Sequence, residues 1–309
     1  MTKETVFTAQ QVSRLTVQEI ERRRNNPHDG LKTQIPLLDE DLNPMRNGQL
    51  IVVLGRPSNY KSGIMQIIAR NTTDQIRKNE NEIIIYVTWE QSIEEHGLIE
   101  LAAASRIDAS KMARGELNDT EWKSLMKAAV RRGVTPLWLI GHSSQAGKRR
   151  PRLSMTDLGE ALAYIVDEAG KTPRLICLDY LQRIRPDNGS GTQREKMMGI
   201  VDRAKDMALA FNVPVVLGTQ AGRQVDERKW KLPQMADGQE TSNLEQSADV
   251  MMSVWMPKTS EMPGTYVGNP EMEVTEDLLY LGLLKQKFGV APRTYALRVK
   301  PAINKIERR

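Results

Sequence analysis

The sequence is poor in the residues that build disulfide frameworks and metal clusters. It contains one cysteine, Cys177, inside an apolar run, and only three histidines scattered over 309 residues. A single cysteine excludes an intramolecular disulfide and a cysteine-rich metal site, and it suits a reducing compartment. Three scattered histidines do not supply the clustered ligands of a histidine metal site.

Long apolar runs and repeats are also missing. No apolar stretch approaches the roughly 20 residues that a membrane-spanning helix needs. The polar N-terminal stretch, which carries Glu4, does not resemble a secretory signal. No internal repeat or long low-complexity tract is present. We therefore expect a cytoplasmic protein without membrane association.

Size and charge leave room for a large fold and a polyanionic partner. A length of 309 residues fits one large domain or two small ones, and 39% hydrophobic residues suffice for a sizeable core. The formal net charge is +5 and the sequence pI is about 9.2. A mildly basic protein is compatible with nucleic-acid binding but does not require it.

Residues 48–65 carry the strongest local signal. An apolar run over residues 50–54 predicts a buried strand, a tight loop follows, and Lys61-Ser62 opens a helix-like segment. This order is typical of a phosphate-binding loop, because backbone N–H groups and the helix dipole both favour phosphate. Lys61 would neutralise the β- and γ-phosphates, and the Ser62 hydroxyl would ligate Mg²⁺. An ordinary strand–turn–helix with a chance Lys-Ser pair is the alternative for this stretch alone.

One position of this loop departs from the usual pattern, in which a glycine precedes the lysine. Here that residue is Tyr60. Glycine tolerates unusual backbone angles and close approach of phosphate, so a tyrosine could strain the loop or shift the nucleotide. The residues that we expect to contact the nucleotide are Gly55, Arg56, Pro57, Ser58, Asn59, Tyr60, Lys61 and Ser62.

The apolar run at residues 82–89 predicts a second buried strand, and it ends in Glu90. A carboxylate at the carboxyl end of a strand, beside a phosphate loop, is placed to act as the general base for water attack. A capping or solvated glutamate is the alternative, because Glu94, Glu95 and Glu100 follow on a predicted helix.

Two later strands also end in polar residues. The apolar strand at residues 174–181 carries Asp179, which would hold Mg²⁺ together with the Ser62 hydroxyl. A charged residue at the end of a buried strand needs a partner, and a cation supplies one. The strand at residues 213–218 is followed by Gln220, which could sense the γ-phosphate or hold the attacking water.

Alternation of strands and helices along the chain predicts an α/β fold. We expect a mostly parallel twisted sheet with helices on both faces, closed by antiparallel strands at residues 278–285 and 294–300. The carboxyl ends of parallel strands share one edge of a sheet, where ligands bind. Lys61, Glu90, Asp179 and Gln220 should therefore converge there.

Four segments stand outside this core. Residues 8–24 predict a helix with Thr8 as N-cap, which packs either on its own domain or on a neighbouring subunit. The long loop at 222–243 and the basic loop at 143–152 could contact nucleic acid, although a solvated loop is the alternative for the basic one. The Pro- and Gly-bearing residues 257–275 predict a loose insertion.

The order of these elements resembles the C-terminal motor domain of DnaB-type replicative helicases, which has a RecA-like P-loop NTPase fold. The resemblance covers about residues 30–306. Residues 55–62 resemble the family's phosphate loop, residues 88–91 its catalytic glutamate segment, and residues 178–182 its Walker B segment. Later segments of the family resemble residues 212–216, 219–223, 244–249 and 285–289.

The resemblance implies a hexameric ring that hydrolyses ATP with Mg²⁺ at subunit interfaces and translocates on single-stranded DNA. Glu90, Lys61 and Gln220 would act within one subunit, whereas Lys285 and Lys287 would reach the neighbour's γ-phosphate. Residues 1–30 would form a linker-type helix and connector, and residues 31–309 the motor domain. We expect the family's separate N-terminal domain to be missing.

Three departures from the family pattern qualify this reading. Tyr60 replaces the loop glycine, and Lys287 stands where the family has an arginine finger, which loses the bidentate fork. Gln239-Glu240 replaces an Arg-Glu pair in the DNA-contacting loop. The residues that could compensate, besides residues 148–152, are Arg223, Lys229 and Lys231. These departures favour, as the alternative, a DNA-associated ATPase platform with little unwinding. Glu90 and Asp179 argue against a scaffold without turnover.

Overall fold

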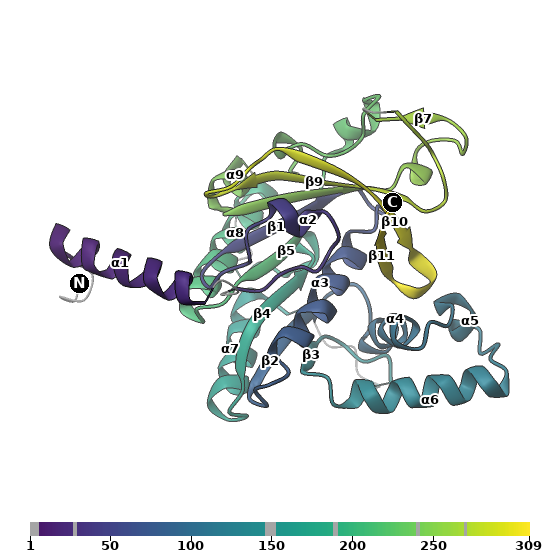
Figure 1. Cartoon of the computed structure of the whole chain (residues 1–309), viewed down its shortest axis with the longest axis horizontal. Coiled ribbons are helices and arrows are strands. Elements are labelled where there is room, and N and C mark those ends of the chain that lie inside the picture. Colours follow the sequence, from purple (N-terminus) through teal and green to yellow (C-terminus); the bar gives the residue numbers. More distant parts are fainter. Residues whose placement is uncertain (1–5, 27–29, 146–152, 188–190, 239–241, 269–270) are drawn as a thin grey trace.

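The computed structural model describes residues 6–26, 30–145, 153–187, 191–238, 242–268 and 271–309. Its centre is a nine-stranded sheet in the order β11-β10-β9-β6-β1-β5-β4-β2-β3 (Figure 1). The six strands from β6 to β3 run parallel: β1 Leu50–Gly55, β2 Glu82–Thr88, β3 Leu137–Ile140, β4 Thr172–Asp179, β5 Val215–Gln220 and β6 Val250–Trp255. The three remaining strands add antiparallel: β9 Leu278–Gln286, β10 Arg293–Lys300 and β11 Lys305–Arg308. The predicted fold class is therefore confirmed.

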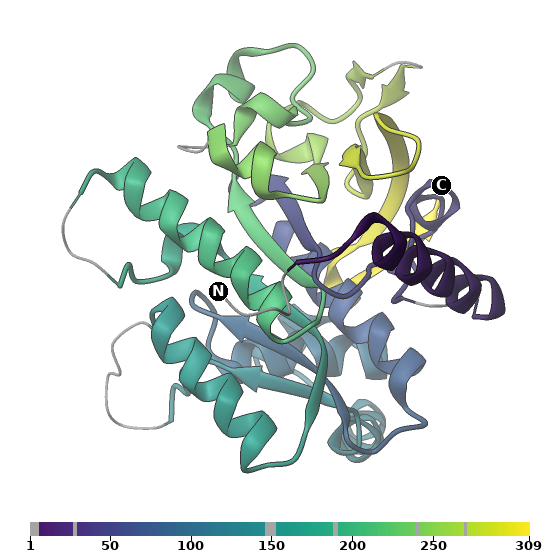
Figure 2. The ribbon, with the colours of Figure 1, turned by 90° about the vertical axis from the view of Figure 1, so that its left-hand side faces the viewer.

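Helices cover both faces of the sheet (Figures 1 and 2). The longer ones are α3 Lys61–Ile76, α4 Ile93–Ser105, α6 Asp119–Gly133, α7 Met155–Asp167 and α8 Gln193–Ala210, with shorter α2 Leu38–Asp41, α5 Ala109–Ala113 and α9 Ser242–Ser247. Alternate residues of β1 enter two separate cores: Ile51 packs with α3, whereas Leu50 packs with α7 and α8. This explains the continuous apolar run of β1, since a parallel strand is buried on both sides. No helix among the described residues is long and apolar enough to cross a membrane.

Two details at the C-terminal side differ from the sequence-based expectation. The described residues of the predicted loose insertion, 257–268 and 271–275, contain the short antiparallel pair β7 Tyr266–Val267 and β8 Met272–Glu273. Val267 packs with Trp255 and Tyr280 in a small core of its own. The strand β11 was also not expected, and it pairs with β10 after the short turn η6 Pro301–Ile303.

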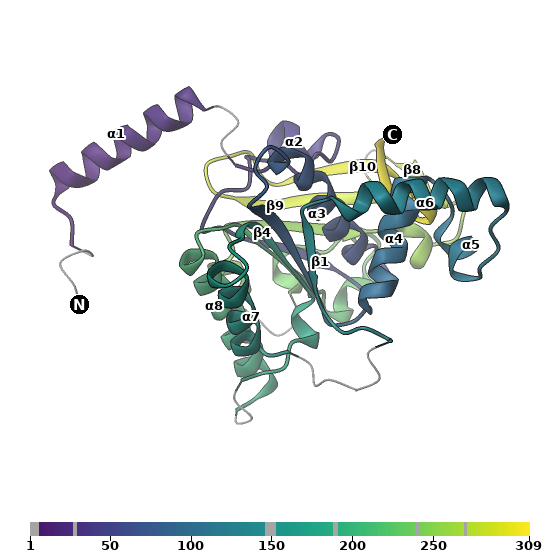
Figure 3. The ribbon, with the colours of Figure 1, turned by 90° about the horizontal axis from the view of Figure 1, so that it is seen from below.

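The N-terminal helix α1 Ala9–Asn25 projects from the body (Figures 1 and 3). Thr8 caps it as expected, through a capping box with Gln11. None of the described residues of α1 is buried in this chain. Its apolar residues Leu15 and Ile20 are 46% and 57% exposed. Of the two predicted ways to pack this helix, burial on its own domain is thus not observed.

A buried histidine on α4 makes the stability of this fold sensitive to acid. His96 is fully buried, packs at 4.5 Å from the ring of Tyr86, and neither ring nitrogen has a hydrogen-bond partner in the described structure. Burial, aided by Arg132 and Arg70, lowers its pKa to about 3. The unfolded chain, with an ordinary pKa near 6.5, therefore binds the proton first as the pH falls.

We expect the free energy of unfolding to drop by about 2 kcal/mol through this group between pH 6.5 and 5, at about 1.4 kcal/mol per pH unit. Above pH 6.5 the contribution is complete. His96→Leu should flatten the slope across this window, as measured by urea unfolding at several pH values. Equal slopes for the two proteins would show that His96 is not the responsible group.

Candidate nucleotide-binding site

The phosphate loop connects β1 to α3. The chain turns at Ser58 and Tyr60, whose φ angles are 63° and 66°, and α3 begins at Lys61. A left-handed tyrosine stores about 1 kcal/mol of strain, which a glycine there would not. A cavity of about 450 Å³ opens above the loop. Its lining includes Arg56, Pro57, Ser58, Tyr60, Lys61, Ser62, Glu90, Tyr180 and Gln220.

Lys61 is almost completely buried at the floor of this cavity. Its ammonium lies 3.8 Å from the centroid of the Tyr180 ring. Burial lowers the pKa of Lys61, and the carboxylates of Asp179 and Glu90 oppose that shift. A buried cation at the N-terminus of a helix is stabilised by any anion that enters, so the floor favours phosphate.

Ser62 and Asp179 meet beside Lys61, although they are far apart in the sequence. The Ser62 hydroxyl donates to Asp179 Oδ1 at 3.1 Å, and the Tyr86 hydroxyl donates to Asp179 Oδ2 at 2.7 Å. Burial raises the pKa of Asp179, while Lys61 and the two hydroxyl groups oppose the rise. A carboxylate and a hydroxyl oxygen in contact are hard ligands that fit Mg²⁺, so these residues suit the predicted metal.

Glu90 and Gln220 come from the two strands that flank this pair. Glu90 follows β2 and stays half exposed at the cavity, where Oε1 lies 3.9 Å from a guanidinium nitrogen of Arg183. Gln220 is the register partner of Gly55, and its backbone N–H donates to Gln182 Oε1 at 3.2 Å. The predicted convergence at the carboxyl edge is therefore present in the geometry.

Two of the predicted loop contacts do not line the cavity. The side chain of Asn59 is turned away from it, and its Oδ1 accepts from the backbone N–H of Met256 at 2.9 Å and from Thr259 at 3.0 Å. Gly55 lies against β6, where an added Cβ would come within 2.8 Å of Val254 Cγ1. Asn59, through its hydrogen bonds, and Gly55, through close packing on β6, therefore fix the loop to the sheet.

Arg56 connects the phosphate loop to the long polar loop. Its guanidinium donates to both carboxylate oxygens of Asp226, at 3.0 and 2.6 Å, and to the carbonyl of Ala221 at 3.1 Å. Asp226 lies in the short turn η3 Arg223–Glu227. A bidentate Arg–carboxylate pair fixes geometry as well as distance, so these two loops are held together.

Lys285 and Lys287 lie at the edge of the sheet formed by the amino ends of the parallel strands, opposite the edge that carries the cavity. Lys285 pairs in register with Met251 of β6, whereas Gly55 pairs with Val254. Met251 and Val254 are three residues apart on β6, which is about 10 Å along the strand. Neither lysine therefore lies in the cavity of its own chain. The ammonium of Lys285 donates to the carbonyls of Glu245 and Ala248, at 2.6 and 2.7 Å.

Lys287 is the more accessible of the two lysines. Its side chain is 64% exposed and lies 3.1 Å from Asp249 Oδ1. Burial opposes ionisation of Asp249, yet its hydrogen bonds to Lys205, to the backbone N–H of Leu50 and to Lys287 lower its pKa. Lys287 is thus exposed to solvent while its ammonium pairs with Asp249, and a second molecule can reach it.

The candidate DNA contacts fall into three groups. Arg223 and Lys229 are exposed on the long loop. Lys231 is bound to Glu261 at 2.6 Å, which leaves it less available for a phosphate than the other two. The neighbouring Trp230 anchors the loop by packing edge-on against the rings of Trp255 and Tyr280. Gln239, Glu240 and the basic residues 148–152 lie outside the described residues.

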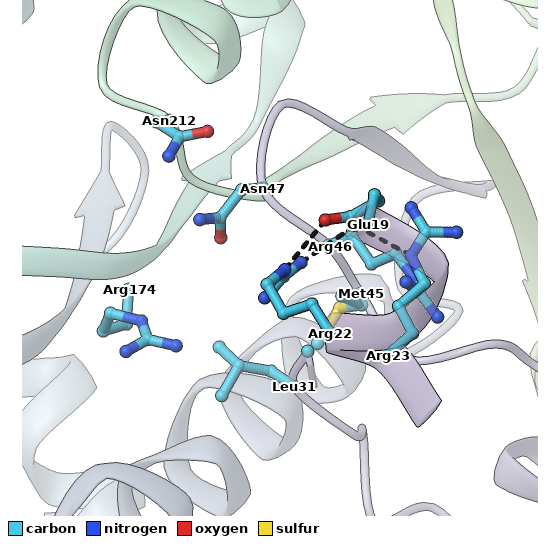
Figure 4. A pocket seen from close by; sticks show the side chains of 10 residues that line it. Glu19, Arg22, Arg23, Leu31, Met45, Arg46, Asn47, Arg174 and Asn212 are labelled. Atoms are coloured by element: carbon cyan, nitrogen blue, oxygen red, sulfur yellow. Dashed lines mark hydrogen bonds and ion pairs between the residues drawn. The ribbon is translucent and has the colours of Figure 1, made fainter. Parts of the chain in front are cut away.

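A second cavity, of about 410 Å³, lies between α1 and the amino edge of the sheet (Figure 4). Arg22 and Arg23 of α1 both pair with Glu19 there, and Arg174 and Asn212 line the other side. None of the predicted site residues lies in it. The cavity above the phosphate loop therefore remains the candidate site.

Among the residues of the site that sequence reasoning missed are three that contact predicted side chains. Tyr86 holds Asp179, Arg183 faces Glu90, and Asp226 holds Arg56. The signal for Tyr86 was its polar hydroxyl group inside an otherwise apolar strand. Arg183 follows the strand that carries Asp179 closely, which was the signal for that residue. No local pattern indicated Asp226.

Comparison with known proteins gives a consistent picture. The family model "DnaB-like helicase C terminal domain" matches residues 30–287. The chain is 27% identical over 237 residues to the replicative DNA helicase DnaB of Geobacillus stearothermophilus, covering 75% of this chain and 48% of that one. It is also 27% identical over 242 residues to the replicative DNA helicase DnaC of Bacillus subtilis, with coverage of 76% and 50%. The chain thus spans about half the length of the curated relatives it matches.

Solved structures support the same fold. A DnaB-like replicative helicase, whose structure was described with its interactions with primase, aligns with a TM-score of 0.75 at 20% identity, over 90% of this chain and 63% of that chain. An isolated ATPase domain aligns with a TM-score of 0.80 at 19% identity, over 96% and 98%. With the family model matching most of its length, the chain belongs to the DnaB-like helicase C-terminal domain family.

Proposed function

We propose that this protein is an ATP-driven, ring-forming motor that translocates on single-stranded DNA and unwinds duplex DNA. The observation that carries the proposal is the placement of two complementary half-sites. Lys61, Glu90 and the Ser62–Asp179 pair lie at one edge of the sheet, and Lys287 lies exposed at the other. Copies stacked edge to edge would complete each site.

The proposed reaction is attack of water on the γ-phosphate of ATP. Glu90 would accept the proton of the attacking water, and Gln220 would orient that water. Lys61 and the loop N–H groups bind the phosphates, and Ser62 with Asp179 would hold Mg²⁺, which supplies positive charge to the phosphate oxygens. Lys285 and Lys287 of a neighbouring copy would add positive charge where the transferring phosphoryl group gains negative charge.

The proposed DNA contact is the long loop at residues 222–243. Arg223 and Lys229 are its exposed cations, and Lys231, Gln239 and Glu240 are further candidates. Phosphate contacts of this kind are independent of sequence and weaken with salt. The Arg56–Asp226 pair supports a connection between this loop and the nucleotide.

The proposed ring has a candidate contact on each side of the subunit. The apolar residues Val12, Leu15 and Ile20 of α1 are about half exposed. On α6, Trp122, Met126 and Val130 are 55%, 49% and 73% exposed and recur every four residues, which places them on one face. Exposed apolar faces of this kind mark interaction sites, and we propose that α1 docks on α6 of the adjacent subunit.

We expect Leu15→Glu to impair this assembly, because it places a charge in an apolar contact. The expected result is a shift toward the monomer in light scattering at protein concentrations where the unmodified chain is oligomeric. Gln10→Glu, on the other side of the same helix, adds the same charge and serves as the matched control. An unchanged oligomer for Leu15→Glu would remove α1 from the interface.

The experiment that tests the proposed activity is ATP hydrolysis with and without single-stranded DNA. The expected result is hydrolysis that single-stranded DNA accelerates. Hydrolysis that ignores DNA would contradict a DNA motor, and no ATP binding at all would contradict the nucleotide site.

A second candidate function is an assembly platform, a DNA-associated ATPase with little unwinding. Tyr60, Lys287 and Gln239 favour it, because each departs from the family pattern at a part that drives the motor. Stimulation of hydrolysis by DNA without strand separation would support the platform instead.

A further inference from the structure

The side chain of Tyr60 leaves the phosphate loop and packs across the first turn of α3. A Cβ at Gly63 would come within 2.6, 2.7 and 2.8 Å of three carbons of the Tyr60 ring. The ring therefore occupies space that exists only because residue 63 is glycine. Position 60, a glycine in the usual phosphate-loop pattern, is a tyrosine here, and the absence of a side chain at Gly63 leaves room for its ring.

The hydroxyl of Tyr60 donates to Oδ1 of Asn304, which lies in the turn between η6 and β11. Asn304 is 2% exposed, and all its polar groups are engaged. Its Nδ2 donates to Gln66 Oε1 at 3.3 Å, its carbonyl accepts from Arg70 at 2.6 Å, and its backbone N–H donates to Pro301 at 3.1 Å. Loss of one such bond leaves a buried acceptor unpaired, which is costly.

The same hydrogen bonds extend toward the candidate base. Gln66 Nε2 donates to Gln91 Oε1 at 2.9 Å, and Gln91 follows Glu90 directly. Burial raises the pKa of Tyr60, so the hydroxyl keeps its proton over the usable pH range. A continuous chain of side chains thus joins Tyr60, Asn304, Gln66 and Gln91.

Asn304 also forms a wall of the cavity. The same lining joins the phosphate-loop residues Lys61 and Ser62 with Gln66, Ile99, Pro301 and Asn304, which lie outside the loop. A nucleotide whose phosphates occupied the loop would extend its nucleoside toward lining residues outside the loop, of which Asn304 is one. The position of the wall therefore depends on what holds Asn304.

We infer that Tyr60 is a positioning residue for the nucleoside end of the nucleotide, because it ties Asn304 and the C-terminal turn to the phosphate loop. This inference rests on the proposed nucleotide binding. Tyr60 adds a contact between the phosphate loop and the C-terminal turn, and its effect is not limited to the loss of a flexible glycine. It acts on how tightly the nucleotide is held and not on phosphoryl transfer.

Tyr60→Phe tests the inference, since it keeps the ring over Gly63 and removes only the hydroxyl. The KM for ATP and the Kd for ADP should rise about three- to tenfold, the range of one net hydrogen bond, and kcat should stay within about twofold. Binding of tripolyphosphate, which has no nucleoside, should stay unchanged. Asn304→Gly removes the same bond from the other side, together with the bond to Gln66, and retains the left-handed backbone there (φ 41°), so it should weaken ATP binding at least as much.

A double-mutant cycle separates this inference from simple strain. Tyr60→Gly should also weaken ATP binding, although it restores the usual loop residue. Gly63→Ala should weaken ATP binding by displacing the ring, and should be tolerated once Tyr60→Gly has removed that ring. If Tyr60→Phe and Asn304→Gly bind ATP as tightly as the unmodified chain, the inference is overturned. Tighter binding by Tyr60→Gly would also overturn it. An unmodified chain that binds no ATP would instead overturn the proposed function.

Discussion

Replacing Glu90 by glutamine is expected to reduce ATP turnover by about 10²–10⁴-fold, the usual contribution of a positioned general base. The amide keeps the size and polarity of the side chain but cannot accept the proton of the attacking water. Glu90 is half exposed and lies 3.9 Å from Arg183, so the fold should not depend on its charge. ATP affinity, measured by fluorescence titration, should therefore change little.

Glu80→Gln is the matched control, because Glu80 is an exposed glutamate before the other end of the same strand. It should leave turnover unchanged. Equal loss in both variants would point to a general effect of charge, and full turnover in Glu90→Gln would remove Glu90 from the chemistry.

Lys287→Ala is expected to lower turnover by about 10²–10³-fold without loss of ATP binding. Trans-acting arginines contribute about 10³–10⁵-fold to such reactions, and a lysine keeps the charge without the bidentate fork. ATP contacts made within one subunit stay intact, which is why binding should persist. Lys78→Ala, an exposed lysine after α3, is the control and should behave as the unmodified chain.

Mixing the two inactive variants tests whether Lys287 acts across an interface. A Lys287→Ala subunit still supplies Glu90, and a Glu90→Gln subunit still supplies Lys287. Rings that contain both would therefore include some complete sites, and the mixture should regain part of the turnover. If the mixture stays as inactive as its components, Lys287 does not act in trans.

Local patterns in the sequence were sufficient to predict much of the fold and much of the lining of the cavity. The strand–loop–helix around Lys61 is read from consecutive residues, since a phosphate-binding loop uses its backbone and adjacent side chains. Glu90, Asp179 and Gln220 could be placed because parallel strands end at a common edge. That rule needs only the order of strands, which the apolar runs supply.

Contacts between distant segments could not be read in this way. Asp226 holds Arg56 from 170 positions away, and Asn304 holds Tyr60 from 244 positions away. Asn59 was assigned to the nucleotide because of its place in the loop, whereas its side chain serves Met256. The pair β7 and β8 was missed because strands of two residues leave no periodic pattern.

Unwinding of a forked DNA duplex tests the proposed motor most directly. With ATP and Mg²⁺ present, the full chain should separate a duplex that carries single-stranded tails, and Glu90→Gln should bind the same fork without separating it. Strand separation that depends on ATP hydrolysis is the predicted result. DNA-stimulated hydrolysis with no strand separation at any protein concentration that forms rings would contradict it.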